Sequence, residues 1–123
     1  MSASTMTPRL ELEAVGRVTV VSFLDARIVH DHVIEELGEQ LVRLVEHNGL
    51  RNILLNFGRV RAFSSAGLGK LLILRKKLLQ QRGTLKLCCL NQDLQFLFQL
   101  KCGEGKKSLF EVFHEEQKAL DSF

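Results

Sequence analysis

The sequence predicts a small α/β domain whose mixed β-sheet is opened by a hairpin. Residues 10–15 alternate in polarity and residues 18–23 are mostly β-branched, so we expect two strands joined by the Gly16-Arg17 turn. Beyond the hairpin, apolar stretches typical of strands alternate with stretches of helical periodicity, as in sheets covered by helices. A length of 123 residues suits one domain. We therefore expect a single domain over 9–123 after a flexible tail over 1–8.

The first predicted helix covers residues 31–47, with Asp31 as its cap and Gly49 as a left-handed residue just beyond its end. Its apolar residues recur every three or four positions, at Ile34, Leu37, Leu41, Leu44 and Val45. Residues 50–57 are apolar over most of their length, which fits a strand at the centre of a parallel sheet. We expect the helix to bury its apolar stripe against that sheet.

The second half of the chain repeats this alternation. A helix is predicted over 65–81, packed on the same sheet and followed by a turn at Gly83. The remaining predicted elements are a strand over 84–90, a short helix from an Asn91 cap to near Gly103, a strand over 108–113 and a closing helix over 115–123.

The composition argues against several classes of function. A net charge of +3 is too small to indicate nucleic-acid binding, and the basic residues lack interleaved aromatic residues and a reading motif. No apolar run reaches the length of a membrane span, and the first residues lack the apolar core of a secretory signal. Cys88, Cys89 and Cys102 are odd in number and are not spaced as metal ligands. We expect reduced thiols in a cytoplasmic protein.

No arrangement of residues in the sequence supports catalysis. Phe63 stands where the G-x-S-x-G nucleophile motif around Ser65 would need its leading glycine. The sequence lacks the GxxxxGK[ST] phosphate-binding loop, because Gly67-Leu68-Gly69-Lys70 is too short for it. The pair of histidines at positions 30 and 32 has no third metal ligand in a recognisable motif. We expect no enzymatic activity, no metal and no cofactor.

A serine-rich loop precedes the helix predicted over 65–81. The loop and the first helical turn read Phe63-Ser64-Ser65-Ala66-Gly67-Leu68-Gly69-Lys70. A helix N-terminus has unpaired N–H groups and the positive end of the helix dipole, so it accepts either a capping side chain or a phosphate. From the residues alone, Ser65 is either a simple capping serine or a phosphate acceptor.

The helix after the loop has an apolar and a polar side. Its apolar arc is formed by Leu68, Leu71, Leu72, Leu74, Leu78 and Leu79. Ile73 falls on the opposite side, with Ala66 and the lysines. It is either an isolated surface residue or a contact for a partner beside Ser65, with Lys70 and Lys77 attracting an acidic partner.

This order of elements and the loop motif resemble the STAS domain of bacterial anti-sigma factor antagonists, over about residues 8–123. The resemblance is carried by the strand Asn52-Ile53-Leu54-Leu55-Asn56-Phe57 and by Phe63-Ser64-Ser65-Ala66-Gly67-Leu68-Gly69. The family pattern is Asp-Ser/Thr-x-Gly-Leu-Gly after such a strand, so Ser65 matches the phosphorylated residue and Ser64 replaces the acid. The resemblance implies a STAS-like mixed sheet of four to five strands with helices mainly on one face.

The resemblance also implies a function in bacterial signalling and transcription regulation. The chain would be an anti-sigma factor antagonist that binds an anti-sigma factor of the serine-kinase type, or a related signalling protein, and is released by phosphorylation at Ser65 or, as second choice, Ser64. The expected partner-binding residues are Ser64, Ser65, Ala66, Gly67, Lys70, Ile73 and Lys77. The alternative is a STAS scaffold that is not phosphorylated, which the missing acid at position 64 would allow.

Overall fold

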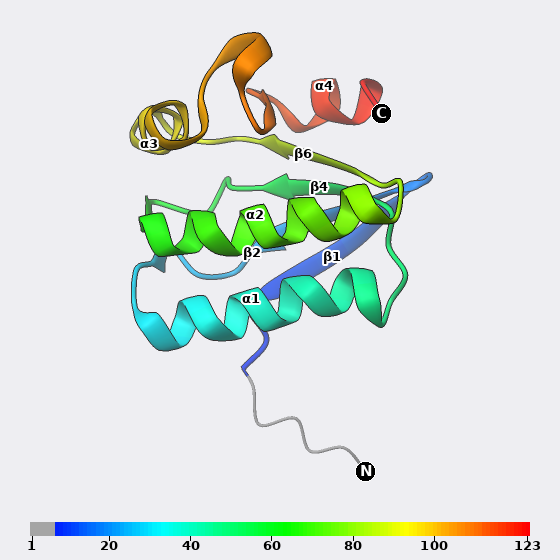
Figure 1. The fold of residues 1–123 in the computed structure, drawn as a ribbon, viewed down its shortest axis with the longest axis horizontal. Helices are drawn as coiled ribbons and strands as arrows, with labels where there is room; N and C mark the ends of the chain where they lie inside the picture. The colour runs from blue at the N-terminus through cyan, green and yellow to red at the C-terminus, as the bar shows by residue number, and fades with distance from the viewer. Residues whose placement is uncertain (1–6) are drawn as a thin grey trace.

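The structure is a computed structural model that describes residues 7–123. It contains a five-stranded sheet in the order β1-β2-β4-β6-β7, in which β1 is antiparallel to β2 and the other neighbours are parallel (Figure 1). The strands are β1 (Leu10–Val15), β2 (Val18–Phe23), β4 (Asn52–Asn56), β6 (Thr84–Cys88) and β7 (Glu111–Phe113). The mixed sheet opened by a hairpin is therefore confirmed.

Three longer helices and one 3₁₀ turn connect the strands, and a short helix follows the last strand. They are α1 (Asp31–Glu46), α2 (Ser65–Gln80), α3 (Gln92–Cys102), the 3₁₀ turn η1 (Gly105–Lys107) and α4 (Glu116–Asp121). Figure 1 shows α1 and α2 side by side over the sheet, with α3 beyond α2 and α4 at the C-terminal end of the chain. Parallel neighbours need such crossover connections, because the chain must return to the starting end of the sheet before the next strand begins.

The helices cover the sheet unequally. The buried residues of α1, α2 and α3 form one large core with one face of the sheet, around fully buried side chains such as Leu41, Leu55 and Leu71. The opposite face has a smaller core in which Ala119 of α4 packs with Leu54 and Cys88. The expected arrangement, with helices mainly on one face, is confirmed.

A second, two-stranded parallel sheet pairs β3 (Arg27–Ile28) with β5 (Ala62–Phe63). Neither segment was predicted as a strand, because two residues are too few to show a strand period. This small sheet fixes the connection into α2 beside the connection into α1. It therefore places the N-terminal ends of the two helices near one another.

Several element boundaries differ from the predictions. Asp31 is the first residue of α1 and not its cap; His30 occupies the cap position and makes no capping side-chain bond. Strand β6 ends at Cys88, because Cys89 has a φ of 68°. Strand β7 begins only at Glu111, after a turn in which the Ser108 hydroxyl donates to the Phe110 carbonyl and accepts from its N–H.

Residues 1–6 of the predicted flexible tail lie outside the described residues. The segment from Thr7 to Arg9, just before β1, lies against α1. The side chain of Gln40 donates to the Thr7 carbonyl at 2.7 Å and accepts from the Arg9 N–H at 2.8 Å. Arg9 also pairs with Glu36 of α1 and with Asp25. These contacts hold the entry to β1 against the first helix.

Candidate partner-binding site

The serine loop forms the N-terminal cap of α2. Ser64 has an extended backbone, and its hydroxyl accepts a long hydrogen bond of 3.4 Å from the Gly67 N–H. Its carbonyl accepts from the same N–H at 3.0 Å, and its own N–H donates to the Ile28 carbonyl of β3. Ser64 is therefore fixed on both sides, by its helix and by the small sheet, and it is half-buried.

Ser65 and Ala66 form the exposed part of the first turn. Ser65 is the first helical residue, and its hydroxyl makes no hydrogen bond to any residue that the structure describes. The first turn of α2 contains no acidic residue. A phosphate on Ser65 would therefore lie at the positive end of the helix dipole without displacing an existing contact.

Gly67 lies beneath this surface and is buried. A Cβ atom at this position would lie 2.8 Å from the ring of Phe63, so no larger residue fits without moving that ring. Phe63 in turn packs among the rings of Phe57 and Phe98, with centroid separations of 5.7 and 5.9 Å. Gly67 thus belongs to the support of the site and offers no side chain to a partner.

Lys70 and Lys77, expected to attract an acidic partner, are paired within the chain. The Lys70 ammonium lies 2.8 Å from a carboxylate oxygen of Glu35, and that of Lys77 lies 2.7 Å from one of Glu46. The bond to Lys77 lowers the pKa of the Glu46 carboxyl. Because both lysines bridge α2 to α1, their charges are largely balanced there, and the expected attraction of an acidic partner finds no support.

Ile73 is exposed, as the helical projection predicted, with 45% of its surface accessible. Together with Ala66, Gly69 and Lys70 it lines an open hollow against α1. Leu79 departs from the same projection: expected on the apolar arc, it is 55% exposed, although Leu78 in the same turn is buried. Ser65, Ala66 and Ile73 are thus exposed on α2, and Lys70 beside them is half-buried.

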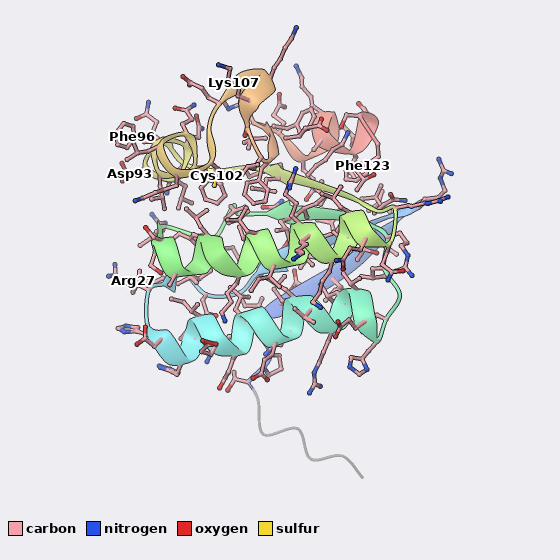
Figure 2. The ribbon with its side chains drawn as sticks, viewed as in Figure 1. Arg27, Asp93, Phe96, Cys102, Lys107 and Phe123 are labelled. Carbon is pink, nitrogen blue, oxygen red and sulfur yellow. The ribbon has the colours of Figure 1, made fainter. Side chains whose placement is uncertain are left out.

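No disulfide joins Cys88, Cys89 and Cys102 (the last is labelled in Figure 2) within residues 7–123. Burial raises the pKa of both the Cys88 and the Cys102 thiols. The same residues contain no group of three or more His, Cys, Asp or Glu side chains placed to hold a metal ion. None of the helices described is both long enough and apolar enough to span a bilayer.

A family model described as the STAS domain matches residues 9–119. The chain belongs to the STAS domain family. A Bordetella bronchiseptica relative named "Putative anti-sigma factor antagonist BtrV" is 32% identical over 96 residues, which are 78% of this chain and 79% of BtrV.

Solved structures of STAS proteins have the same fold. The anti-sigma factor antagonist SpoIIAA in its unphosphorylated form matches with a TM-score of 0.67 at 20% identity, covering 92% of this chain and 96% of SpoIIAA. A STAS domain protein from Planctomyces limnophilus matches with a TM-score of 0.76 at 19% identity, covering 92% and 95%. SpoIIAA from Bacillus is also known in a phosphorylated form, which matches at 23% identity with a TM-score of 0.67, covering 92% of this chain and 97% of SpoIIAA.

Proposed function

We propose that this STAS protein is an anti-sigma factor antagonist that acts by partner switching. In its unmodified form it binds an anti-sigma factor of the serine-kinase type through the start of α2, and thereby releases a sigma factor. Phosphorylation of Ser65 by that partner ends the capture. The observation that carries this proposal is the position of Ser65 in the first turn of α2, where its hydroxyl is exposed and has no hydrogen bond within residues 7–123. The identity to a relative named as an anti-sigma factor antagonist supports it.

Charge explains how one modification would release the partner without unfolding the protein. A phosphoserine carries about −1.5 to −2 charges at pH 7, which the N-terminal end of α2 stabilises. The same charge in a protein interface must be desolvated or must face a like charge, and either effect weakens binding. The switch therefore resides in the surface and leaves the core unchanged.

The chain itself supplies no nucleotide site in this account. The partner kinase binds ATP, and the STAS protein is its substrate and ligand, with no enzymatic activity, metal or cofactor of its own. We also propose that it acts in the cytoplasm of a bacterium, where anti-sigma factors and sigma factors meet. The Ser64 hydroxyl stands at the position of the family's acid and is engaged in the helix cap.

The proposal is tested with Ser65→Asp and Ser65→Ala, by calorimetric titration against the purified kinase-type anti-sigma factor of the same bacterium. Ser65→Asp should fold normally, because an acid in the first helical turn stabilises by about 0.3–1 kcal/mol. It should bind more than about tenfold more weakly than wild type. Ser65→Ala should bind like wild type and remain bound when ATP is added.

Gln92→Asp is the matched control, because Gln92 is the exposed first residue of α3 and the change adds the same charge at the same helical position. It should leave binding unchanged. If Ser65→Asp binds as tightly as wild type, Ser65 is only a helix residue and the chain is a STAS scaffold that is not regulated by phosphate.

A further inference from the structure

A shallow groove runs along the boundary of α1 and α2, next to Ser65. It consists of two adjoining hollows that share Glu35, Lys70 and Ile73. One end is lined by Ala66, the neighbour of Ser65, and the other end by His47 after the last turn of α1. We call this surface, from Ala66 to His47, the α1–α2 groove. It is continuous with the surface that the proposed function assigns to the partner.

A glycine in the middle of α1 gives the groove its floor. Gly38 is buried, and a Cβ atom there would lie 2.6 Å from Cδ of Lys70. The absence of a side chain lets the lysine stem lie flat across α1, so that the ammonium reaches Glu35. The lysine crosses from α2 to α1 and lines both hollows, while Ile73 beside it keeps 45% of its surface exposed. Ile73 is thus an apolar contact among charged side chains.

The walls of the groove are acidic, although the chain as a whole carries a net charge of +3. Its lining residues include four carboxylates and two cations: Asp31, Glu35, Glu39 and Glu46 against Arg43 and Lys70. Lys70 is already balanced by Glu35, and Glu46 is balanced by Lys77, which leaves Asp31 and Glu39 against Arg43. Asp31 and Glu39 are exposed and form no ion pair within residues 7–123. The charge that a docked segment meets here is negative.

We propose that the α1–α2 groove binds a basic segment of the partner that places one apolar side chain on Ile73. This inference rests on the proposed function for the identity of the partner and adds the chemistry of the contact. Opposite charges in the rim mainly accelerate association and select the partner, whereas the buried apolar contact supplies the affinity. A phosphate on Ser65 adds negative charge at the Ala66 end of the groove. It therefore changes the electrostatic interaction between the groove and the docked segment.

Binding of the kinase-type anti-sigma factor provides the first test, by titration at low and high salt. Glu39→Lys should weaken binding roughly five- to tenfold at low salt, and the loss should shrink as salt rises. Glu104→Lys is the matched control, because Glu104 is exposed in the loop after α3 and the change in total charge is the same. Ile73→Ala should weaken binding, whereas Leu100→Ala, on the exposed side of α3, should not.

Two synthetic peptides provide a test that does not depend on the proposed partner. Both are amphipathic helices with leucines on one side; the other side consists of lysines in one peptide and of glutamates in the other. In ¹⁵N-labelled protein, the lysine peptide should shift the amide signals of Gly38, Ala66 and Ile73, and the glutamate peptide should not. Equal binding of both peptides, or lysine-peptide shifts confined to other surfaces, would overturn the inference. Binding of the anti-sigma factor with no effect of Glu39→Lys or Ile73→Ala would overturn it while leaving the proposed function intact.

Discussion

The contact between Gly67 and the ring of Phe63 predicts opposite effects for two neighbouring glycine-to-alanine substitutions in α2. At Gly67 an added Cβ would lie 2.8 Å from Cζ and 2.9 Å from Cε2 of that ring, whereas at Gly69 it would meet no atom within 4 Å. Both substitutions remove the same backbone entropy, which stabilises the helix by about 0.5–1 kcal/mol. Gly67→Ala additionally forces the buried ring to move, and such overpacking costs about 1–3 kcal/mol.

The ring has little freedom to move, because it packs between the rings of Phe57 and Phe98. We therefore expect Gly69→Ala to stabilise the protein by about 0.5–1 kcal/mol. Gly67→Ala should destabilise it by about 1 kcal/mol, the overpacking cost less the backbone gain. Urea denaturation measures both values, and 1 kcal/mol corresponds to about 4 °C in Tm for a domain of this size. If Gly67→Ala were as stabilising as Gly69→Ala, the Phe63 ring would not be packed tightly against the first turn of α2, and this contact would not support the loop.

Three further predictions concern the cap, an ion pair and the buried thiols. Ser64→Ala should lower the free energy of unfolding, measured by urea denaturation, by about 0.5–1 kcal/mol. This is the low end for loss of a helix cap, because the capping hydrogen bond is long. In an NMR titration the pKa of Glu46 should lie below its ordinary value of 4.5 and should return toward it in Lys77→Ala; an unshifted Glu46 would mean that the pair is absent in solution. Because that pKa is lowered by folding, the pair's contribution to stability is present above pH 4.5 and is lost as the pH falls through the lower folded value. Cys88 and Cys102 should resist Ellman's reagent in the native protein at pH 7, since burial both shields these thiols and raises their pKa; rapid modification would contradict this.

The sequence predicted the parts of the fold that depend on local pattern. The hairpin was visible in the alternation of residues 10–15, and Asn91 was correctly identified as a cap, because its side chain accepts from the Leu94 N–H at 2.8 Å. The exposure of Ile73 followed from helical geometry alone. Such features depend on residues that are close in sequence, so the spacing of apolar and polar residues is enough to predict them.

Features that depend on packing between distant segments were not predictable in this way. The pairing of Lys70 with Glu35 spans 35 positions and requires α1 to lie beside α2. Nothing in the helical projection of α2 alone indicates that its lysines are balanced by another helix. Gly38 gave the one available signal, since a glycine within an otherwise regular helical pattern is costly and suggests close packing.

Strand and helix ends were the other source of error. Cys89 continued an apolar run and was expected in a strand over 84–90, but its left-handed backbone ends β6 at Cys88, two residues before the predicted end. Asp31 has the residue type of a cap, yet the helix begins at Asp31 itself. Both outcomes were decided by backbone geometry that residue preferences indicate only weakly.

Phosphorylation of the protein by its partner decides between a switch and a passive scaffold. The purified protein is incubated with the kinase-type anti-sigma factor and ATP, and the modified residue is identified by mass spectrometry, with Ser65→Ala as the control. We expect a single phosphate on Ser65, none on the control, and loss of anti-sigma factor binding by the phosphorylated protein. A phosphate confined to another residue, or phosphorylated protein that binds as tightly as unmodified protein, would contradict this expectation.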